Sequence, residues 1–206
     1  MHPNPAFRKA STDENLAFAR QRSFGTMCVN GAEGPVLAHV PFILAADGTS
    51  VDLHLARSNR VIAEGLPAKA VLAVVGPDAY VSPDWYGVAD QVPTWNYITV
   101  HLRGELFPMP LDGLRAHLEA LSDQFEARLA PKKPWKTAKM TEGVMERMMR
   151  MILPFRLVIA SIDGTWKLGQ NKTAEARAGV IAALGARVGA GWPAGVAQAM
   201  SALPED

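Results

Sequence analysis

GPDAYVSPDWYGVADQVPTWNY, residues Gly76–Tyr97, is the most distinctive segment of this chain. Two Trp and three Tyr fall within 18 of its positions, interleaved with Pro, Ser, Thr and Asn. Aromatic faces beside amide and hydroxyl groups suit the binding of a planar heterocycle. The alternative is a barrel core whose aromatic edges are satisfied, and we favour that alternative for Tyr80 and Trp85.

Short strands flank this segment on both sides, because apolar and polar residues alternate with a period of two, most clearly in Val51–Ala56. The predicted strands are Phe24–Val29, Val36–Leu44, Val51–Ala56, Ala70–Val75, Ala79–Ser82, Trp95–Leu106, Phe155–Ile162 and Thr165–Leu168. Pro41 cannot donate to a ladder, so it predicts an edge or a bulge. Gly76-Pro77 is predicted to close one strand, and Asp163-Gly164 to form the turn of a strand pair.

Helices are expected mostly in the second half of the chain. Ser11 and Glu14 match a capping box at the start of the first one. The predicted helices are 11–22, a short one at 59–64, 111–129, 141–150 and 174–184, and the tail from Gly185 is read as a weak helix or disordered. Strands followed by helices predict an α+β fold in a single domain, residues 1–206, built as a barrel with attached helices.

Composition narrows the class of protein. The chain has 206 residues and a formal net charge of +1, so it has no overall attraction to nucleic acid or membrane. One cysteine, Cys28, excludes an internal disulfide and argues against a secreted scaffold. Its apolar runs are far shorter than the roughly 20 residues of a membrane-spanning helix. The expected location is the cytoplasm, and no membrane association is expected.

Several catalytic and metal-binding signatures are missing. The chain has no GxGxxG, GxxxxGK[ST], HExxH, GxSxG or CxxC motif, and its five histidines lack zinc-ligand spacing, so no metal site is predicted. Cys28 is interpreted as a buried small hydrophobe. His39, His54 and His101 are candidate acids or bases by residue type alone, and a structural role is favoured for each. The catalytic residues therefore stay unknown.

Two polar segments lie beside predicted helix starts. Arg57, Ser58 and Asn59 end a strand where a helix begins, which suits a phosphate because the guanidinium, hydroxyl and free backbone N–H groups all donate. An ordinary N-cap beside a surface Arg explains that segment equally well. Asp163–Lys172 carries Lys167, Gln170 and Asn171, and taken alone it would be an exposed loop with a helix cap.

Together these segments resemble the PaiB family, and the match spans nearly the whole chain in order. The matching motifs are Met1–Phe7 (MHPNPAF), Ala38–Phe42 (AHVPF), His54–Asn59 (HLARSN), Gly76–Tyr86 (GPDAYVSPDWY), Val92–Tyr97 (VPTWNY) and Lys167–Asn171 (KLGQN). Two positions depart from the family pattern. Gly169 replaces a serine, which removes one hydroxyl and adds flexibility. Arg60 follows Asn59 where proline is frequent, and its added cation would either help the phosphate site or be solvated.

The resemblance implies an FMN-binding split β-barrel like that of pyridoxamine 5′-phosphate oxidases, with two subunits packed barrel to barrel and FMN at their interface. It implies that the phosphate faces Arg57–Asn59, while the β-strand at 40–44 and the segment 94–97 flank the ring and the ribityl chain. Lys167, Gln170 and Asn171 would approach from the partner subunit. The residues implied in FMN binding are His39, Pro41, Phe42, Arg57, Ser58, Asn59, Thr94, Trp95, Asn96, Lys167, Gln170 and Asn171.

Several functions fit such a protein. The family is described as FMN-binding negative transcriptional regulators, so a flavin-dependent or flavin-sensing regulator is the first hypothesis. An FMN-dependent oxidoreductase acting on an unidentified small molecule is the alternative, and a flavin-binding subunit of a larger assembly is a third. Direct DNA binding is doubtful. The basic stretch Arg128–Lys139 is interpreted first as a solvated loop and second as a nucleic-acid patch.

Overall fold

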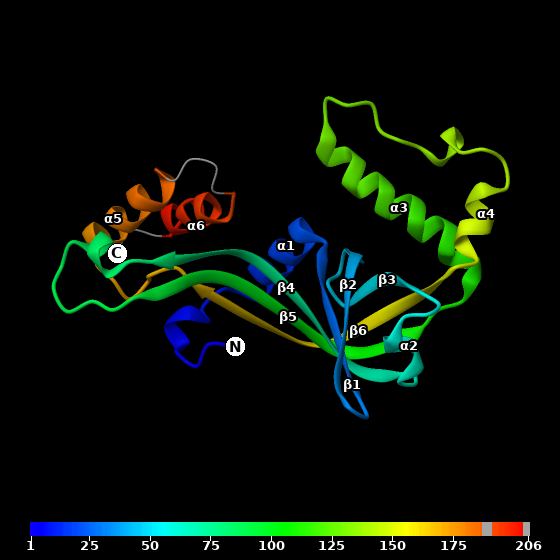
Figure 1. The fold of residues 1–206 in the computed structure, drawn as a ribbon, viewed down its shortest axis with the longest axis horizontal. Coiled ribbons are helices and arrows are strands. Elements are labelled where there is room, and N and C mark those ends of the chain that lie inside the picture. The colour runs from blue at the N-terminus through cyan, green and yellow to red at the C-terminus, as the bar shows by residue number, and fades with distance from the viewer. Residues whose placement is uncertain (187–190, 204–206) are drawn as a thin grey trace. The chain divides into compact units, whose positions relative to one another are not determined.

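The computed structural model describes residues 1–186 and 191–203 and divides the chain into two compact units (Figure 1). Unit 2 comprises Leu16–Val74 and His101–Ile162, and unit 1 comprises Met1–Asn15, Val75–Val100 and the described part of Asp163–Asp206. Three long strands, β4 (Ala68–Val81), β5 (Thr94–Pro108) and β6 (Ile152–Lys167), contribute one end to each unit. Each unit is therefore described by itself.

Unit 2 is built on a closed antiparallel barrel. Its other strands are β1 (Phe24–Gly31), β2 (Gly34–Leu44) and β3 (Ser50–Ala56), and the strand order is β1-β2-β3-β6-β5-β4. The pairing of β1 with β4, Cys28 opposite Val71, closes the ring. The α+β class and the predicted barrel with attached helices are confirmed.

Alternating side chains fill the barrel. On β3, Val51, Leu53 and Leu55 are buried, while Asp52 and His54 point outward and are half-buried. The largest fully buried side chains of the barrel strands are Phe42, Phe155, Met27, Leu53, Leu72, Leu102, Leu106 and Leu157. The period-two pattern in the sequence thus identified the inward face correctly, because only that face leaves water.

Pro41, which predicted an edge or a bulge, lies where β2 changes its pairing partner. β2 pairs with β1 as far as Pro41, which lies opposite Phe24, and pairs with β3 from Phe42 onward. Proline therefore stands where the pairing of β2 passes from one neighbour to the other, and its missing N–H is tolerated there.

Two predicted turns are wrong. β4 continues through Gly76-Pro77 as one strand, and β6 continues through Asp163-Gly164. The predicted strands 70–75 and 79–82 are thus parts of β4, and 155–162 and 165–168 belong to β6 and the residue after it. At Gly164 a Cβ atom would lie 2.0 Å from Asn15 Oδ1, so this glycine serves close packing rather than a turn.

The helices follow the predicted order. They are α1 (Thr12–Arg22), α2 (Arg60–Ala63), α3 (Leu114–Glu126), α4 (Val144–Met149), α5 (Ala174–Gly185) and α6 (Gly191–Ser201), with short 3-10 turns η1 (Pro5–Phe7), η2 (Pro83–Tyr86), η3 (Leu111–Gly113), η4 (Ala127–Leu129) and η5 (Thr137–Lys139). The capping box is confirmed: Ser11 N donates to Glu14 Oε2 at 2.7 Å and Glu14 N donates to Ser11 Oγ at 3.2 Å.

The weak C-terminal helix is present as α6, while residues 187–190 and 204–206 of the predicted tail lie outside the described residues. In unit 1, α5 packs against α6 and against η2. A Cβ atom at Gly179 would lie 2.2 Å from the Trp85 carbonyl oxygen, which shows how closely α5 approaches η2. None of the described helices is long and apolar enough to cross a membrane.

Candidate functional site

The predicted site residues divide evenly between the two units. Those of unit 2 are His39, Pro41, Phe42, Arg57, Ser58 and Asn59, and those of unit 1 are Thr94, Trp95, Asn96, Lys167, Gln170 and Asn171. The two groups are built on different elements.

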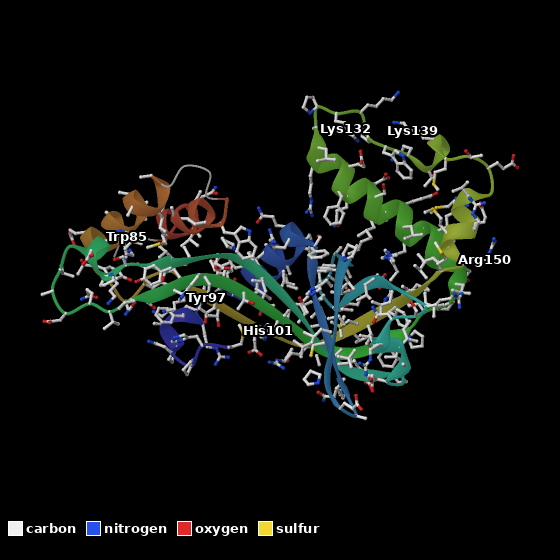
Figure 2. All side chains as sticks on the ribbon, in the orientation of Figure 1. Trp85, Tyr97, His101, Lys132, Lys139 and Arg150 are labelled. Atoms are coloured by element: carbon white, nitrogen blue, oxygen red, sulfur yellow. The ribbon has the colours of Figure 1, made fainter. Side chains whose placement is uncertain are left out.

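Arg57 follows β3 and is held by the end of α4. Its backbone N–H donates to the Met151 carbonyl at 2.9 Å, and its Nε donates to the Arg150 carbonyl at 2.6 Å. Arg150 is labelled at this helix end in Figure 2. The bond through Nε fixes the guanidinium of this exposed residue and leaves its two terminal nitrogens for a ligand, as bidentate phosphate binding requires.

Ser58 and Asn59 connect β3 to α2. Asn59 is the N-cap residue of α2, and its Oδ1 accepts a hydrogen bond from Val61 N at 3.0 Å. Ser58 is exposed. Asn59 is therefore an ordinary N-cap residue, the alternative to a phosphate site that the sequence also allowed. This cap leaves the Asn59 amide nitrogen, the Ser58 hydroxyl and the Arg57 guanidinium as the donors of this segment.

The β2 residues face opposite sides of the barrel wall. His39 is exposed and its Nδ1 lies 3.0 Å from Thr26 Oγ1, and Pro41 on the same face is half-buried. Phe42 points inward and is fully buried. A ligand outside the barrel can therefore contact Phe42 only through its backbone.

Four of the six residues in unit 1 line one pocket of about 190 Å³. They are Thr94, Asn96, Lys167 and Asn171. The other lining residues are Asn4, Phe7, Tyr86, Val92, Gly169 and Lys172. The N-terminal segment, η2, the start of β5 and the loop after β6 thus meet around a set of amides, two ammonium groups and two aromatic rings.

Lys167 is fixed at this pocket by neutral acceptors. Its Nζ donates to Thr94 Oγ1 and, at 2.9 Å, to the Trp95 carbonyl oxygen, and it lies 5.9 Å from the centre of the Phe7 ring. Burial and the nearby Lys172 ammonium lower the pKa of Lys167. A group that binds here gains most if it carries negative charge.

Two predicted contacts have other roles in the structure. Trp95 is 53% exposed and packs edge-to-face on Tyr80, with ring centroids 6.3 Å apart. Gln170 forms hydrogen bonds within its own loop. Its Oε1 accepts from Leu168 N at 2.8 Å, and its Nε2 donates to the Trp166 carbonyl oxygen. Gln170 therefore shapes the loop that carries Lys167 and Asn171 rather than lining their pocket.

The barrel-core interpretation of the aromatic segment is wrong for Tyr80, which is 42% exposed, and for Trp85, which is half-buried in η2 of unit 1 (Figure 2). Both rings belong to unit 1, where the aromatic segment folds beside α5 instead of filling the barrel.

Sequence reasoning missed several pocket residues. Phe7 and Asn4 come from the N-terminal motif, where His2 N donates to Thr165 Oγ1 at 3.1 Å and the His2 ring packs on Phe7. Lys172 directly follows the KLGQN motif, and its Nζ lies 5.1 Å from the centre of the Tyr86 ring. The available signal is the motif Met1–Phe7, which matches the family pattern but contributes none of the residues implied in FMN binding.

A second hollow, of about 650 Å³, lies on the outside of the barrel in unit 2 across β1, β4, β5 and β6. Its apolar lining is Cys28, Ala70, Val71, Phe107, Val158 and Ala160. Cys28, interpreted from the sequence as a buried small hydrophobe, is half-buried at this surface. Gly104 permits the close approach of β5 and β6 here, since a Cβ atom would lie 1.8 Å from the Val158 carbonyl oxygen.

The basic stretch Arg128–Lys139 packs against α3 (Figure 2). Lys136 Nζ lies 2.6 Å from Asp123 Oδ1, and Lys132 Nζ pairs with Glu126. Trp135 N also donates to Glu126 Oε2, at 2.7 Å. These pairs neutralise part of the stretch.

Comparisons with known proteins agree with this architecture. A family model described as "Putative FMN-binding domain" matches residues 1–161. The chain is 28% identical over 169 residues to "Protease synthase and sporulation protein PAI 2" of Bacillus subtilis, a match that covers 81% of this chain and 80% of that protein.

Two solved structures share the fold. The FAD and heme binding protein of Mycobacterium smegmatis superposes with a TM-score of 0.57 at 18% identity, covering 79% of this chain and 74% of that one. A flavocytochrome of Azotobacter vinelandii superposes with a TM-score of 0.55 at 14% identity, covering 81% and 72%. At these identities the likeness shows the fold alone.

Proposed function

This chain belongs to the FMN-binding family whose model matches residues 1–161, and from that premise we propose that it is a PaiB-type flavoprotein that acts as a flavin-dependent or flavin-sensing regulator. One observation supports the assignment of the cofactor site above the others. Arg57, at the end of β3, is fixed by a hydrogen bond from its Nε, and this bond leaves its terminal nitrogens for a phosphate. The regulatory side of the proposal rests on the resemblance to the PaiB family, and the Bacillus subtilis protein that is 28% identical to this chain is named for protease synthesis and sporulation.

We propose that each group of donors holds one part of FMN. Arg57, Ser58 and the Asn59 amide would hold the phosphate, with His39, Pro41 and the Phe42 backbone beside the ring. Thr94, Trp95 and Asn96 would face the ring and the ribityl chain, and Lys167, Gln170 and Asn171 would come from the partner subunit. The bound flavin would supply the capacity to exchange hydride or electrons, while the chain binds and orients it.

We further propose a twofold homodimer in which the hollow on the outer face of the barrel meets a second copy. The hollow is mostly apolar, and its rim carries Arg103 and the Lys69–Glu105 pair, whose charged atoms lie 3.5 Å apart. An apolar centre with a charged rim is typical of a stable subunit interface. A shared flavin site between barrels requires this symmetry.

An FMN-dependent oxidoreductase is the second candidate. It is favoured by the unit 1 pocket, whose two lysines would bind a small anionic substrate. Among the residues that line the pocket, none is a carboxylate or an imidazole, so a general acid or base would have to come from Tyr86 or a lysine. Burial raises the pKa of Tyr86, which keeps its hydroxyl as a donor.

Direct binding of duplex DNA stays doubtful. The net charge is +1, and Lys132 and Lys136 are engaged by carboxylates of α3, whereas phosphate contacts dominate non-specific affinity for DNA. We expect no sequence-specific binding in an anisotropy assay with promoter fragments at ~150 mM salt. Tight, selective binding under those conditions would instead make a DNA-binding regulator the first candidate.

The central proposal is tested by titrating the purified chain with FMN and with riboflavin, following the flavin absorbance and fluorescence. Because the site is built around a phosphate, FMN should bind at micromolar concentration and riboflavin more weakly. A chain that binds neither flavin would refute the proposed function.

A further inference from the structure

The unit 1 pocket brings two ammonium groups together on neutral acceptors. Lys167 Nζ donates to the Thr94 hydroxyl and the Trp95 carbonyl, and Lys172 Nζ lies 2.5 Å from Gln91 Oε1. Their mutual repulsion contributes to the lowered pKa of Lys167. No carboxylate is present among the ten residues that line the pocket. The site therefore favours a ligand with negative charge.

The remaining lining restricts the shape of that ligand. The Phe7 ring lies beneath Lys167 and the Tyr86 ring beneath Lys172, and both aromatic side chains are almost fully buried. The amides of Asn4 and Asn171 supply donors and acceptors, while the buried Asn96 amide nitrogen lies 3.4 Å from Met200 Sδ. Flat apolar walls below two cations suit an aromatic ring that carries an anionic group.

The pocket within one chain is too small to enclose a whole flavin. Its volume is about 190 Å³, below the roughly 300–1,000 Å³ of pockets that enclose drug-sized ligands. FMN carries a single phosphate, and the proposed function assigns that phosphate to Arg57. Lys172 has no part in the proposed flavin site and is left for the anion of a different, smaller molecule. Lys167, which the proposed function brings to the flavin from the partner subunit, would contact that anion as well.

We propose that this pocket binds a small aromatic carboxylate, with its carboxylate between Lys167 and Lys172 and its ring against Phe7 and Tyr86. This inference rests on the proposed function in assigning the flavin phosphate to Arg57, and it adds a second ligand to Lys167, which the proposed function already brings to the flavin. In a regulator the carboxylate would be the sensed metabolite, and in an oxidoreductase it would be the substrate or an inhibitor that takes the substrate's place.

Benzoate is a suitable probe, and benzamide is its uncharged isostere. Calorimetric titration of the FMN-loaded protein should show benzoate binding at least tenfold more tightly than benzamide. Lys172→Gln should weaken benzoate roughly tenfold to hundredfold, as expected when one charge-assisted hydrogen bond is lost. Lys172→Arg should restore part of the affinity. Lys133→Gln removes an exposed lysine outside the pocket and should change nothing.

Flavin content is measured in every variant, which separates this inference from the proposed function. A wild-type protein that retains FMN but binds benzoate no better than benzamide overturns the carboxylate site and leaves the flavoprotein intact. Binding of inorganic phosphate in place of benzoate overturns the assignment to a carboxylate. If Lys172→Gln loses FMN and wild type does not bind benzoate, the pocket is part of the flavin site and the proposed carboxylate site is wrong.

Discussion

Gly164 shows how one glycine can set the course of a strand. A Cβ atom there would lie 2.0 Å from Asn15 Oδ1. Asn15 is buried and cannot move aside, because its Oδ1 accepts from Trp166 Nε1 at 2.9 Å and its Nδ2 donates to the Ser11 carbonyl at 2.9 Å. The glycine therefore lets α1 approach β6 within unit 1.

We expect Gly164→Ala to lower the free energy of unfolding by about 1–3 kcal/mol, the usual cost of overpacking. The measurement is denaturant unfolding followed by tryptophan fluorescence. Gly113→Ala is the matched control, because a Cβ atom there meets open space and its φ is −79°. Equal stability of the two variants would show that Asn15 is not held as described.

Arg57 carries the discrimination between FMN and riboflavin. Loss of a charge-assisted bond to phosphate costs roughly 1.5–3 kcal/mol, so Arg57→Ala should weaken FMN on the order of tenfold to hundredfold and riboflavin much less. Arg57→Lys should recover only part of the affinity, because lysine cannot form a bidentate contact. Fluorescence titration with both flavins measures these effects.

Arg60→Ala provides the control for Arg57, since the Arg60 side chain is 73% exposed and lies 4.0 Å from Glu64. It should leave the preference for FMN nearly unchanged. An equal loss of FMN and riboflavin in Arg57→Ala would give Arg57 a structural role at the end of α4 instead.

At the scale of elements, a histidine pair joins α3 to the barrel of unit 2. His54 Nδ1 on β3 lies 3.3 Å from His117 Nε2 on α3, and the rings pack edge-to-face. Burial lowers the pKa of both residues, and His54 lowers that of His117 further, while Asp52 raises it in part. Asp52 itself is held by Arg156 at 2.6 Å.

The sign of the pH effect follows from these lowered pKa values. Well above pH 6.5, the ordinary histidine pKa, both histidines are neutral in the folded and in the unfolded chain, so the pair does not reduce the free energy of unfolding. As the pH falls from 6.5 toward the lowered folded-state pKa, the unfolded chain takes up protons that the folded chain resists. Thermal unfolding should therefore give a lower Tm at pH 5.5 than at pH 7.5.

His117→Gln should reduce this dependence on pH, because it removes one titrating member of the pair. His39→Gln, which changes an exposed histidine of the same unit, should keep the wild-type dependence. If the Tm of wild type stays level between pH 7.5 and 5.5, the pair does not resist protonation in the folded state.

At the scale of the whole molecule, the outer hollow of the barrel predicts the oligomeric state. Light scattering should give about twice the 22.2 kDa of one chain. Val158 is 46% exposed in the lining of the hollow, so Val158→Glu should give a monomer, because a buried unpaired charge is costly at an interface. Leu129→Glu, at an equally accessible leucine of η4, should stay dimeric.

A wild-type monomer that still binds FMN would contradict the shared site. It would also remove the reason for assigning Lys167, Gln170 and Asn171 to a partner subunit.

Local patterns in the sequence located most helices and strand segments and indicated the family. Alternation defined the barrel-facing side of β3, Ser11 and Glu14 defined the start of α1, and the ordered motifs predicted the FMN-binding family. These signals depend on neighbours within a few residues, so they can be read without knowing the fold.

Only the tertiary structure decided what those elements enclose. Gly76-Pro77 and Asp163-Gly164 favour turns locally, yet β4 and β6 run through them because partner strands and the approach of Asn15 override a local preference. The pocket joins Phe7, Tyr86 and Lys172, which are far apart in sequence, and Glu126 neutralises Lys132. Such contacts depend on distances in space, and a pattern along the chain cannot supply them.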